Sequence, residues 1–99
     1  MSAGTIARPA LPPGARHYSS SPRFTEVTLP EKLTGLHRTK PGVWGRLVGE
    51  EGALTFIEPG PPEIVRRVLA GEVEIIAPER PHRVAVDGPV CFLIEFYRE

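Results

Sequence analysis

Short apolar runs alternate with turn-forming residues along most of the chain. Clusters of Pro, Gly, Asp and Glu separate these runs at intervals of about 8 to 12 residues, a spacing typical of short antiparallel strands. The pattern favours an all-β sandwich or barrel of about seven or eight mainly antiparallel strands. A single helical turn is predicted from Pro30 to Leu33, because proline is tolerated at a first helical position and Gly35 follows. The runs predict strands at 24–29, 36–40, 43–48, 53–57, 64–69, 73–77, 82–86 and 90–97.

The N-terminal residues 1–23 follow a different pattern. They hold four of the twelve prolines and a serine run, with almost no apolar periodicity. This composition is typical of segments that do not pack into a core. We therefore predict a flexible N-terminal arm at 1–23 and one β-domain at 24–99.

The last strand is mostly apolar on both faces. Successive side chains of a strand point to opposite faces, so its residues fall into two sets. One set is Val90, Phe92, Ile94 and Phe96, and the other is Cys91, Leu93, Glu95 and Tyr97. We expect one face to be the core and the other to be covered by the N-terminal arm or a second subunit. Asp87-Gly88, just before this strand, predicts a hairpin turn.

Length and charge narrow the choice of partners. The 99 residues allow one small domain, and twelve basic and twelve acidic residues give a net charge of zero. This balance provides no electrostatic argument for a nucleic-acid or membrane partner, whereas it leaves self-association into a homodimer unopposed. No apolar run is long enough for a membrane helix and no apolar signal core is present, so we expect a cytoplasmic protein. The lone Cys91 lies in an apolar run and is expected to be a small buried hydrophobe.

Two histidines in separate predicted strands suggest one site. His82 shares its strand face with Val84 and Val86, which predicts that its imidazole points inward. His37 lies about forty residues earlier, before a Pro-Gly turn. Two inward imidazoles are good ligands for a divalent metal such as zinc, iron or nickel. The alternative is structural: one hydrogen-bonded core histidine and one loop histidine.

A metal site needs further ligands, and a binding pocket needs walls. Glu95 is the best carboxylate candidate, because an unpaired charge in an apolar strand is costly. If the opposite face of that strand is the core, however, Glu95 points outward. Lys40 and Trp44 flank the Pro-Gly turn and are candidates for a cationic anchor and an aromatic wall. The alternative for this pair is a surface lysine and a core tryptophan.

An ordered series of short motifs resembles the small cupin-like domain of the TehB-like tellurite-resistance proteins, over about 25–97. The motifs are Leu29-Pro30, Leu36-His37-x-Thr39-Lys40-x-Gly42-x-Trp44-Gly45, Gly52-x-Leu54-x-Phe56, Ile76-x-Pro78-x-x-Pro81-His82-Arg83-Val84 and Glu95-Phe96-Tyr97. The resemblance implies a cupin fold, a double-stranded β-helix barrel, and an association with tellurite resistance. Such a domain occurs alone or ahead of a methyltransferase domain, and this chain is expected to be the stand-alone form.

The cupin pattern is only partly present. The usual first cupin motif has two histidines and a glutamate. His37 fits its first histidine, but Thr39 takes the place of the second histidine, and Trp44 or Gly45 falls where the glutamate would be. His82 fits the histidine of the second motif. The resemblance therefore implies two of the four usual ligands. We expect a domain that binds a divalent metal and a small molecule or oxyanion in its barrel, or else a non-catalytic ligand-binding or protein-interaction module; no reaction is assigned.

Overall fold

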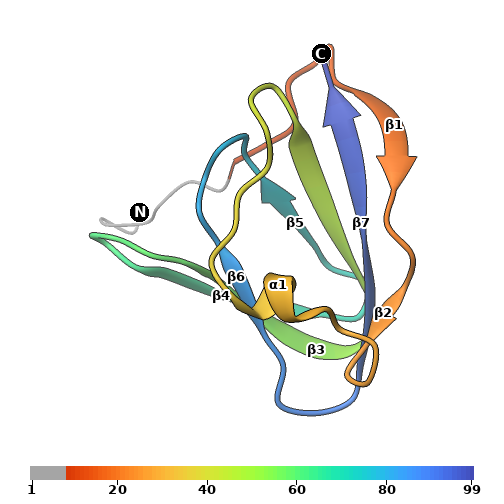
Figure 1. Cartoon of the computed structure of the whole chain (residues 1–99). Coiled ribbons are helices and arrows are strands. Elements are labelled where there is room, and N and C mark those ends of the chain that lie inside the picture. Colours follow the sequence, from red (N-terminus) through yellow and green to blue (C-terminus); the bar gives the residue numbers. More distant parts are fainter. Residues whose placement is uncertain (1–8) are drawn as a thin grey trace, which may run out of the picture.

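The computed structural model describes residues 9–99 and shows one antiparallel sheet of seven strands (Figure 1). Within these residues there is one short helix. The all-β expectation is confirmed, and residues 1–8 of the predicted arm lie outside the described residues. The elements are β1 (Arg16–Ser20), β2 (Phe24–Thr25), α1 (Glu31–Thr34), β3 (Trp44–Glu58), β4 (Ile64–Leu69), β5 (Val73–Ile76), β6 (Arg83–Ala85) and β7 (Val90–Arg98).

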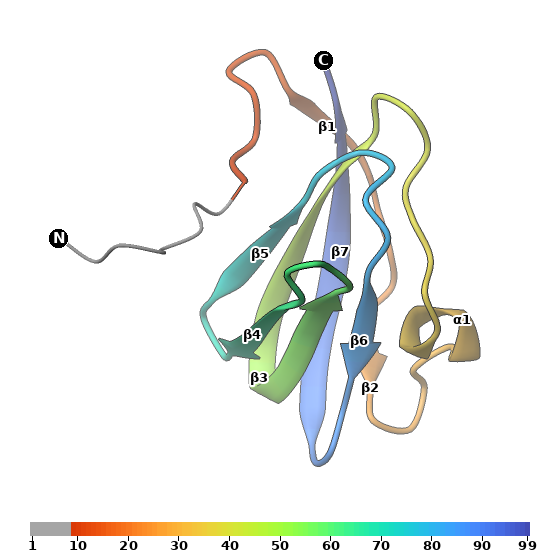
Figure 2. The same cartoon turned by 90° about the vertical axis from the view of Figure 1, so that its left-hand side faces the viewer.

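The long strand β3 is the centre of the sheet. Its first half pairs with β5 on one side and β7 on the other, and its second half pairs with β4 and β6. The register with β7 shifts between Gly49 and Glu51, and Gly52 adopts a positive φ of 67°. This bulge accompanies a bend, so that the two halves of β3 run in different directions (Figure 2). The sequence pattern predicted two strands with a turn at this place, and the structure has one bent strand.

The core lies on the concave side of this bent sheet. Phe56 and Phe92 are fully buried at its centre. The alternation predicted for the last strand is confirmed, because Val90 and Ile94 are also buried on the core face of β7. The remaining buried members of the cluster are Leu33, Leu47, Leu54, Val68, Ile76 and Val84.

Some details of the predicted architecture were wrong. The sheet does not close into a double-stranded β-helix barrel within the described residues, and its strand order ends at β1 and β4. Asp87-Gly88 does not form a hairpin, since β6 and β7 both pair with β3. The strand predicted at 36–40 is a single bridge between His37 and His82.

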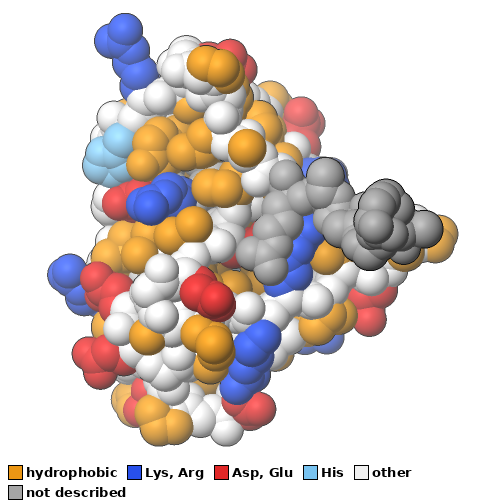
Figure 3. Space-filling model, turned by 180° about the vertical axis from the view of Figure 1, so that it is seen from behind, with side chains coloured by type: hydrophobic (Ala, Val, Ile, Leu, Met, Phe, Trp, Pro, Cys, Tyr) orange, Lys and Arg blue, Asp and Glu red, His pale blue; other side chains and the backbone are white. Residues whose placement is uncertain are grey.

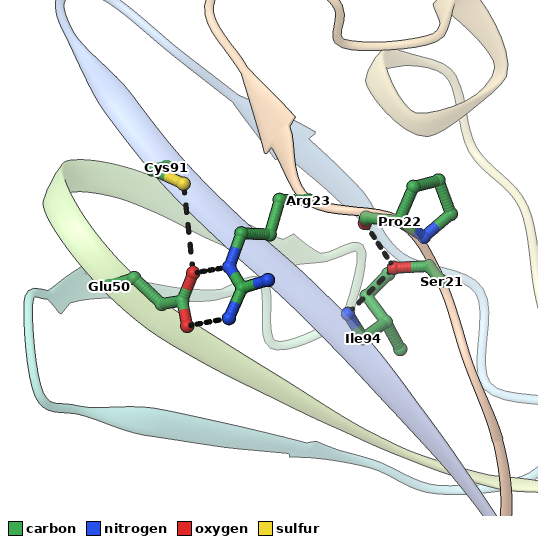
Figure 4. A network of polar contacts seen from close by, with 6 residues as sticks. All are labelled: Ser21, Pro22, Arg23, Glu50, Cys91 and Ile94. Carbon is green, nitrogen blue, oxygen red and sulfur yellow. Dashed lines mark hydrogen bonds and ion pairs between the residues drawn. The ribbon is translucent and has the colours of Figure 1, made fainter.

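The chain before β2 is attached to the sheet. β1 lies within the segment that was predicted as an arm, and it pairs with β7 along the sheet edge. The hydroxyl of Ser21 accepts a 2.9 Å hydrogen bond from the Ile94 amide (Figure 4). Arg23 donates two hydrogen bonds to the Glu50 carboxylate, at 2.6 and 3.3 Å, and the Cys91 thiol contacts the same carboxylate. Burial and the Glu50 carboxylate raise the pKa of the Cys91 thiol, which favours its protonated form.

The convex face of the sheet carries half-buried apolar side chains between charged ones. The register places Trp44 beside Tyr97 and Val48 beside Leu93 on this face. Figure 3 shows hydrophobic side chains, in orange, interspersed with charged groups on this side of the molecule. The homodimer expected from the two-sided last strand stays a prediction. No helix among the described residues is long and apolar enough to cross a membrane.

The bend of β3 generates a prediction about Gly52. A Cβ at this position would lie 1.9 Å from the Pro89 carbonyl oxygen, whereas Gly42 has a similar positive φ of 76° and nothing within 4 Å. Gly42→Ala should therefore lose only about 1–2 kcal/mol of unfolding free energy, from left-handed strain. Gly52→Ala should lose clearly more, because backbone must also move. Urea denaturation of the two variants measures the difference, and equal losses would show that the bend does not need this glycine.

Candidate functional site

The segment 31–43 crosses the concave side of the sheet and covers one end of the core (Figures 1 and 2). α1 begins after Pro30 and ends at Gly35, as predicted, and buries Leu33 against the core. The predicted Pro-Gly turn is present: the Val43 amide donates to the Lys40 carbonyl at 3.0 Å, and Gly42 has the positive φ that a type II turn requires. These two features fix the ends of the stretch that carries His37.

His37 and His82 lie side by side. Each donates its backbone N–H to the other's carbonyl, at 3.0 and 2.9 Å. Their rings meet edge to face, with centroids 4.2 Å apart. His82 is 2% exposed and stacks on Phe56, with the ring centroids 5.4 Å apart, whereas His37 is partly exposed. The structure therefore brings together the two histidines that the sequence pattern paired, and the inward orientation of His82 is confirmed.

Hydrogen bonds to backbone carbonyls determine which nitrogen of each imidazole ring carries the proton. Nδ1 of His37 lies 2.9 Å from the Gly35 carbonyl oxygen, and Nδ1 of His82 lies 2.9 Å from that of Arg80. A carbonyl oxygen only accepts, so each Nδ1 carries the proton. In the neutral rings, the Nε2 atoms are therefore left with their lone pairs. Burial lowers the pKa of His82 from 6.5 to about 4, and nearby His37 adds to this, so His82 is neutral at pH 7.

A cavity of about 380 Å³ adjoins the histidine pair. Its walls come from β1, α1, the 37–43 stretch, β5, the His82 segment and β7, so all of these elements are needed to form it. A bulge in β1 between His17 and Ser19 allows the consecutive residues Tyr18 and Ser19 both to line it. The apolar lining residues are Leu33, Val43, Ile76, Ile94 and Phe96.

The charged groups around the cavity are all basic. Lys32 and Lys40, the only lysines of the chain, line it together with Arg38 and Arg98. None of the residues that line it in the described structure is Asp or Glu. Within residues 9–99 no ion pair joins any of the four to a carboxylate. Arg98 instead lies over the Tyr18 ring, 4.3 Å from its centroid. A neutral protein thus has a locally positive cavity.

Two of the candidates from the sequence lie elsewhere. Glu95 is on the convex face, where it accepts hydrogen bonds from Arg46 at 2.8 Å and from the Tyr97 hydroxyl at 3.1 Å. The Arg46 bond lowers the pKa of Glu95 and accounts for its charge without a metal. Glu95 therefore does not join the histidine pair, because the opposite face of β7 is the core. Trp44 also faces the convex side and does not line the cavity, whereas Lys40 does.

Several cavity residues were missed from the sequence. Arg98 was detectable, because the face of the last strand that carries Ile94 and Phe96 continues to residue 98. Arg38 is an exposed residue that lines the cavity. Tyr18 had no signal, since a bulge in an edge strand leaves no clear pattern. Among residues 9–99, no group of three or more His, Cys, Asp or Glu side chains is arranged to hold a metal ion.

The fold and the site define an open antiparallel β-domain with a histidine pair beside a basic cavity. The family model of the TehB-like domain matches residues 19–94, and the chain belongs to this family. No curated protein sequence matches the chain.

Two solved structures are similar to this one. A crystal structure of a protein from Escherichia coli K12 has a TM-score of 0.79 and 26% identity, and the match covers 89% of this chain and 94% of that one. TehB from Haemophilus influenzae has a TM-score of 0.72 and 26% identity, over 86% of this chain and 32% of TehB. The chain therefore corresponds to about a third of TehB and to nearly the whole of the E. coli protein.

The buried neutral state of His82 predicts how stability depends on pH. An unfolded histidine takes up a proton near pH 6.5, and His82 in the folded protein does so only near pH 4. Between these values the unfolded state binds more protons, so the unfolding free energy should fall as the pH drops, by roughly 3 kcal/mol in all. Urea denaturation at pH 7 and pH 5 should show about 2 kcal/mol of this loss, and His82→Gln should reduce it. The control His17→Gln removes an exposed histidine and should keep the loss; an identical slope in both variants would contradict the assignment.

Proposed function

We propose that this domain binds a small anion in the cavity beside His37 and His82. The observation that supports the proposal most strongly is the charge of the lining, which has four cationic side chains and no carboxylate. A concave surface with one sign of charge concentrates the field and attracts ligands of opposite charge. The adjoining walls are apolar, which limits competition from water and strengthens each polar contact.

Five other basic residues of the described chain have carboxylate partners, unlike these four cations, whereas Arg16 and Arg83 lie outside the cavity and form no ion pair within residues 9–99. Arg46, Arg66 and Arg67 form ion pairs with carboxylates, as do Arg23 and Arg80. The charges of those guanidinium groups are neutralised by carboxylates of the protein itself. The cations at the cavity have no such partner, and a bound anion would provide one.

Binding of inorganic phosphate and of acetate to the ¹⁵N-labelled protein tests this proposal by NMR titration at low ionic strength. Both anions should shift the amide signals of the 37–43 stretch. Lys40→Gln should weaken binding on the order of fivefold, since one exposed charge contributes up to about 1 kcal/mol. Arg83→Gln, which removes a charge outside the cavity, is the matched control. No binding of either anion at tens of millimolar, or equal weakening by both substitutions, would disprove the proposal.

A second candidate is a divalent metal held by the Nε2 atoms of His37 and His82. The supporting observation is the pair of Nδ1–H bonds to backbone carbonyls, the arrangement that orients metal-binding imidazoles. Two protein ligands are fewer than zinc sites usually have. The remaining positions of zinc, iron or nickel would be filled by water or by the anion, where the metal would act as a Lewis acid. Without a metal, the two histidines would have a structural role in a non-catalytic binding module.

Elemental analysis of the untagged protein, after incubation with zinc, iron or nickel salts and gel filtration, decides between these roles. If the metal candidate is correct, about one metal per chain should be retained. His37→Ala and His82→Ala should each abolish retention, and His17→Ala should preserve it. If no form of the protein retains metal, or if both site variants retain it, the metal candidate is wrong and the histidines have the structural role alone.

A further inference from the structure

We propose that the natural ligand is an organic anion with an apolar body, rather than a bare inorganic oxyanion. This inference rests on the anion-binding function proposed above and specifies its ligand class. It arises from three features of the cavity: its size, the separation of its apolar and charged walls, and the contribution of an aromatic side chain from the edge strand.

The cavity is larger than an inorganic oxyanion requires. Its volume of about 380 Å³ lies within the range of pockets that hold small organic molecules. It corresponds to about a dozen water molecules, taking roughly 30 Å³ for each. An oxyanion made of one central atom and a few oxygens would leave most of this space to water, against an apolar surface.

The apolar and charged walls are separate. Ile76 and Ile94 are 1% and 5% exposed and belong to the hydrophobic core, and Phe96 packs against that core from the end of β7. The four cations are exposed, so their charged groups lie at the rim. An anion with its charged group at the rim and its apolar part on the core side would satisfy both walls.

The edge strand closes one side of this rim. Tyr18 and Arg98 both line the cavity, and the guanidinium of Arg98 lies over the Tyr18 ring. The stacked pair combines an aromatic surface with a positive charge. A ligand with both an anionic group and an apolar body would contact both parts of the pair, whereas a bare oxyanion would use only the charge.

Straight-chain carboxylates from formate to hexanoate, compared with inorganic phosphate, test this inference by NMR titration. Each methylene that enters the apolar part should tighten binding by up to about fourfold. Phe96→Ala should reduce this dependence on chain length, and Phe96→Leu should preserve much of it if the alanine variant is poorly folded. Phe24→Ala is the matched control, because Phe24 packs on the same core without lining the cavity.

The outcomes separate the two proposals. If affinity increases with chain length and Phe96→Ala removes the increase, the ligand class is supported. If phosphate and formate bind as tightly as hexanoate, the cavity binds anions without selecting an apolar body, and only this inference is overturned. If no carboxylate and no phosphate binds, the anion-binding function itself is overturned.

Discussion

The structure depends on the bend of β3. One strand pairs with four others, and it does so because its two halves run in different directions around the shift at Gly49–Glu51. The first half builds the layer that carries the wall of the cavity on β7. The second half carries Phe56, on which His82 stacks. Without the bend, the histidine pair and the walls of the cavity would not face each other.

The histidine pair fastens the covering segment to this sheet. The segment 31–43 has only one helical turn and one bridge, and it buries Leu33 and Val43. The two backbone hydrogen bonds between His37 and His82 join it to the chain just before β6, and the Glu79 amide adds a 3.2 Å bond to the Thr39 carbonyl. The residues at the candidate site are therefore also the residues that hold its cover in place, and a variant of either histidine changes both properties.

Strong local patterns predicted much of this structure, and patterns that depend on distant pairing did not. The alternation around His82 gave its inward orientation, and the alternation along the last strand gave its two sets of residues, because a period of two is set by the strand itself. The Pro-Gly turn and the helical turn after Pro30 were also local. The direction of the Glu95 side chain depended on which face of β7 is buried. The bulge that brings Tyr18 to the cavity depends on the pairing of β1 with the far end of the chain. Neither is encoded in a short stretch.

Net charge was the least informative property. Twelve acidic and twelve basic residues cancel, and this balance gave no indication of a charged ligand. In the fold, Glu50, Glu58 and Glu95 pair with arginines away from the cavity. These pairs remove negative charge from the surroundings and leave the cations at the cavity without carboxylate partners. The local field is thus set by how the charges are distributed and not by their sum.

The two candidate ligands would favour opposite protonation states of His82. A metal binds the neutral imidazole, which the buried position already favours at pH 7. An anion near the ring favours the protonated form and opposes the effect of burial. Because both Nδ1 atoms already bond to carbonyls, any proton gained by either ring goes to Nε2, the same atom that a metal would occupy. Proton and metal would therefore compete for one position, the Nε2 atom.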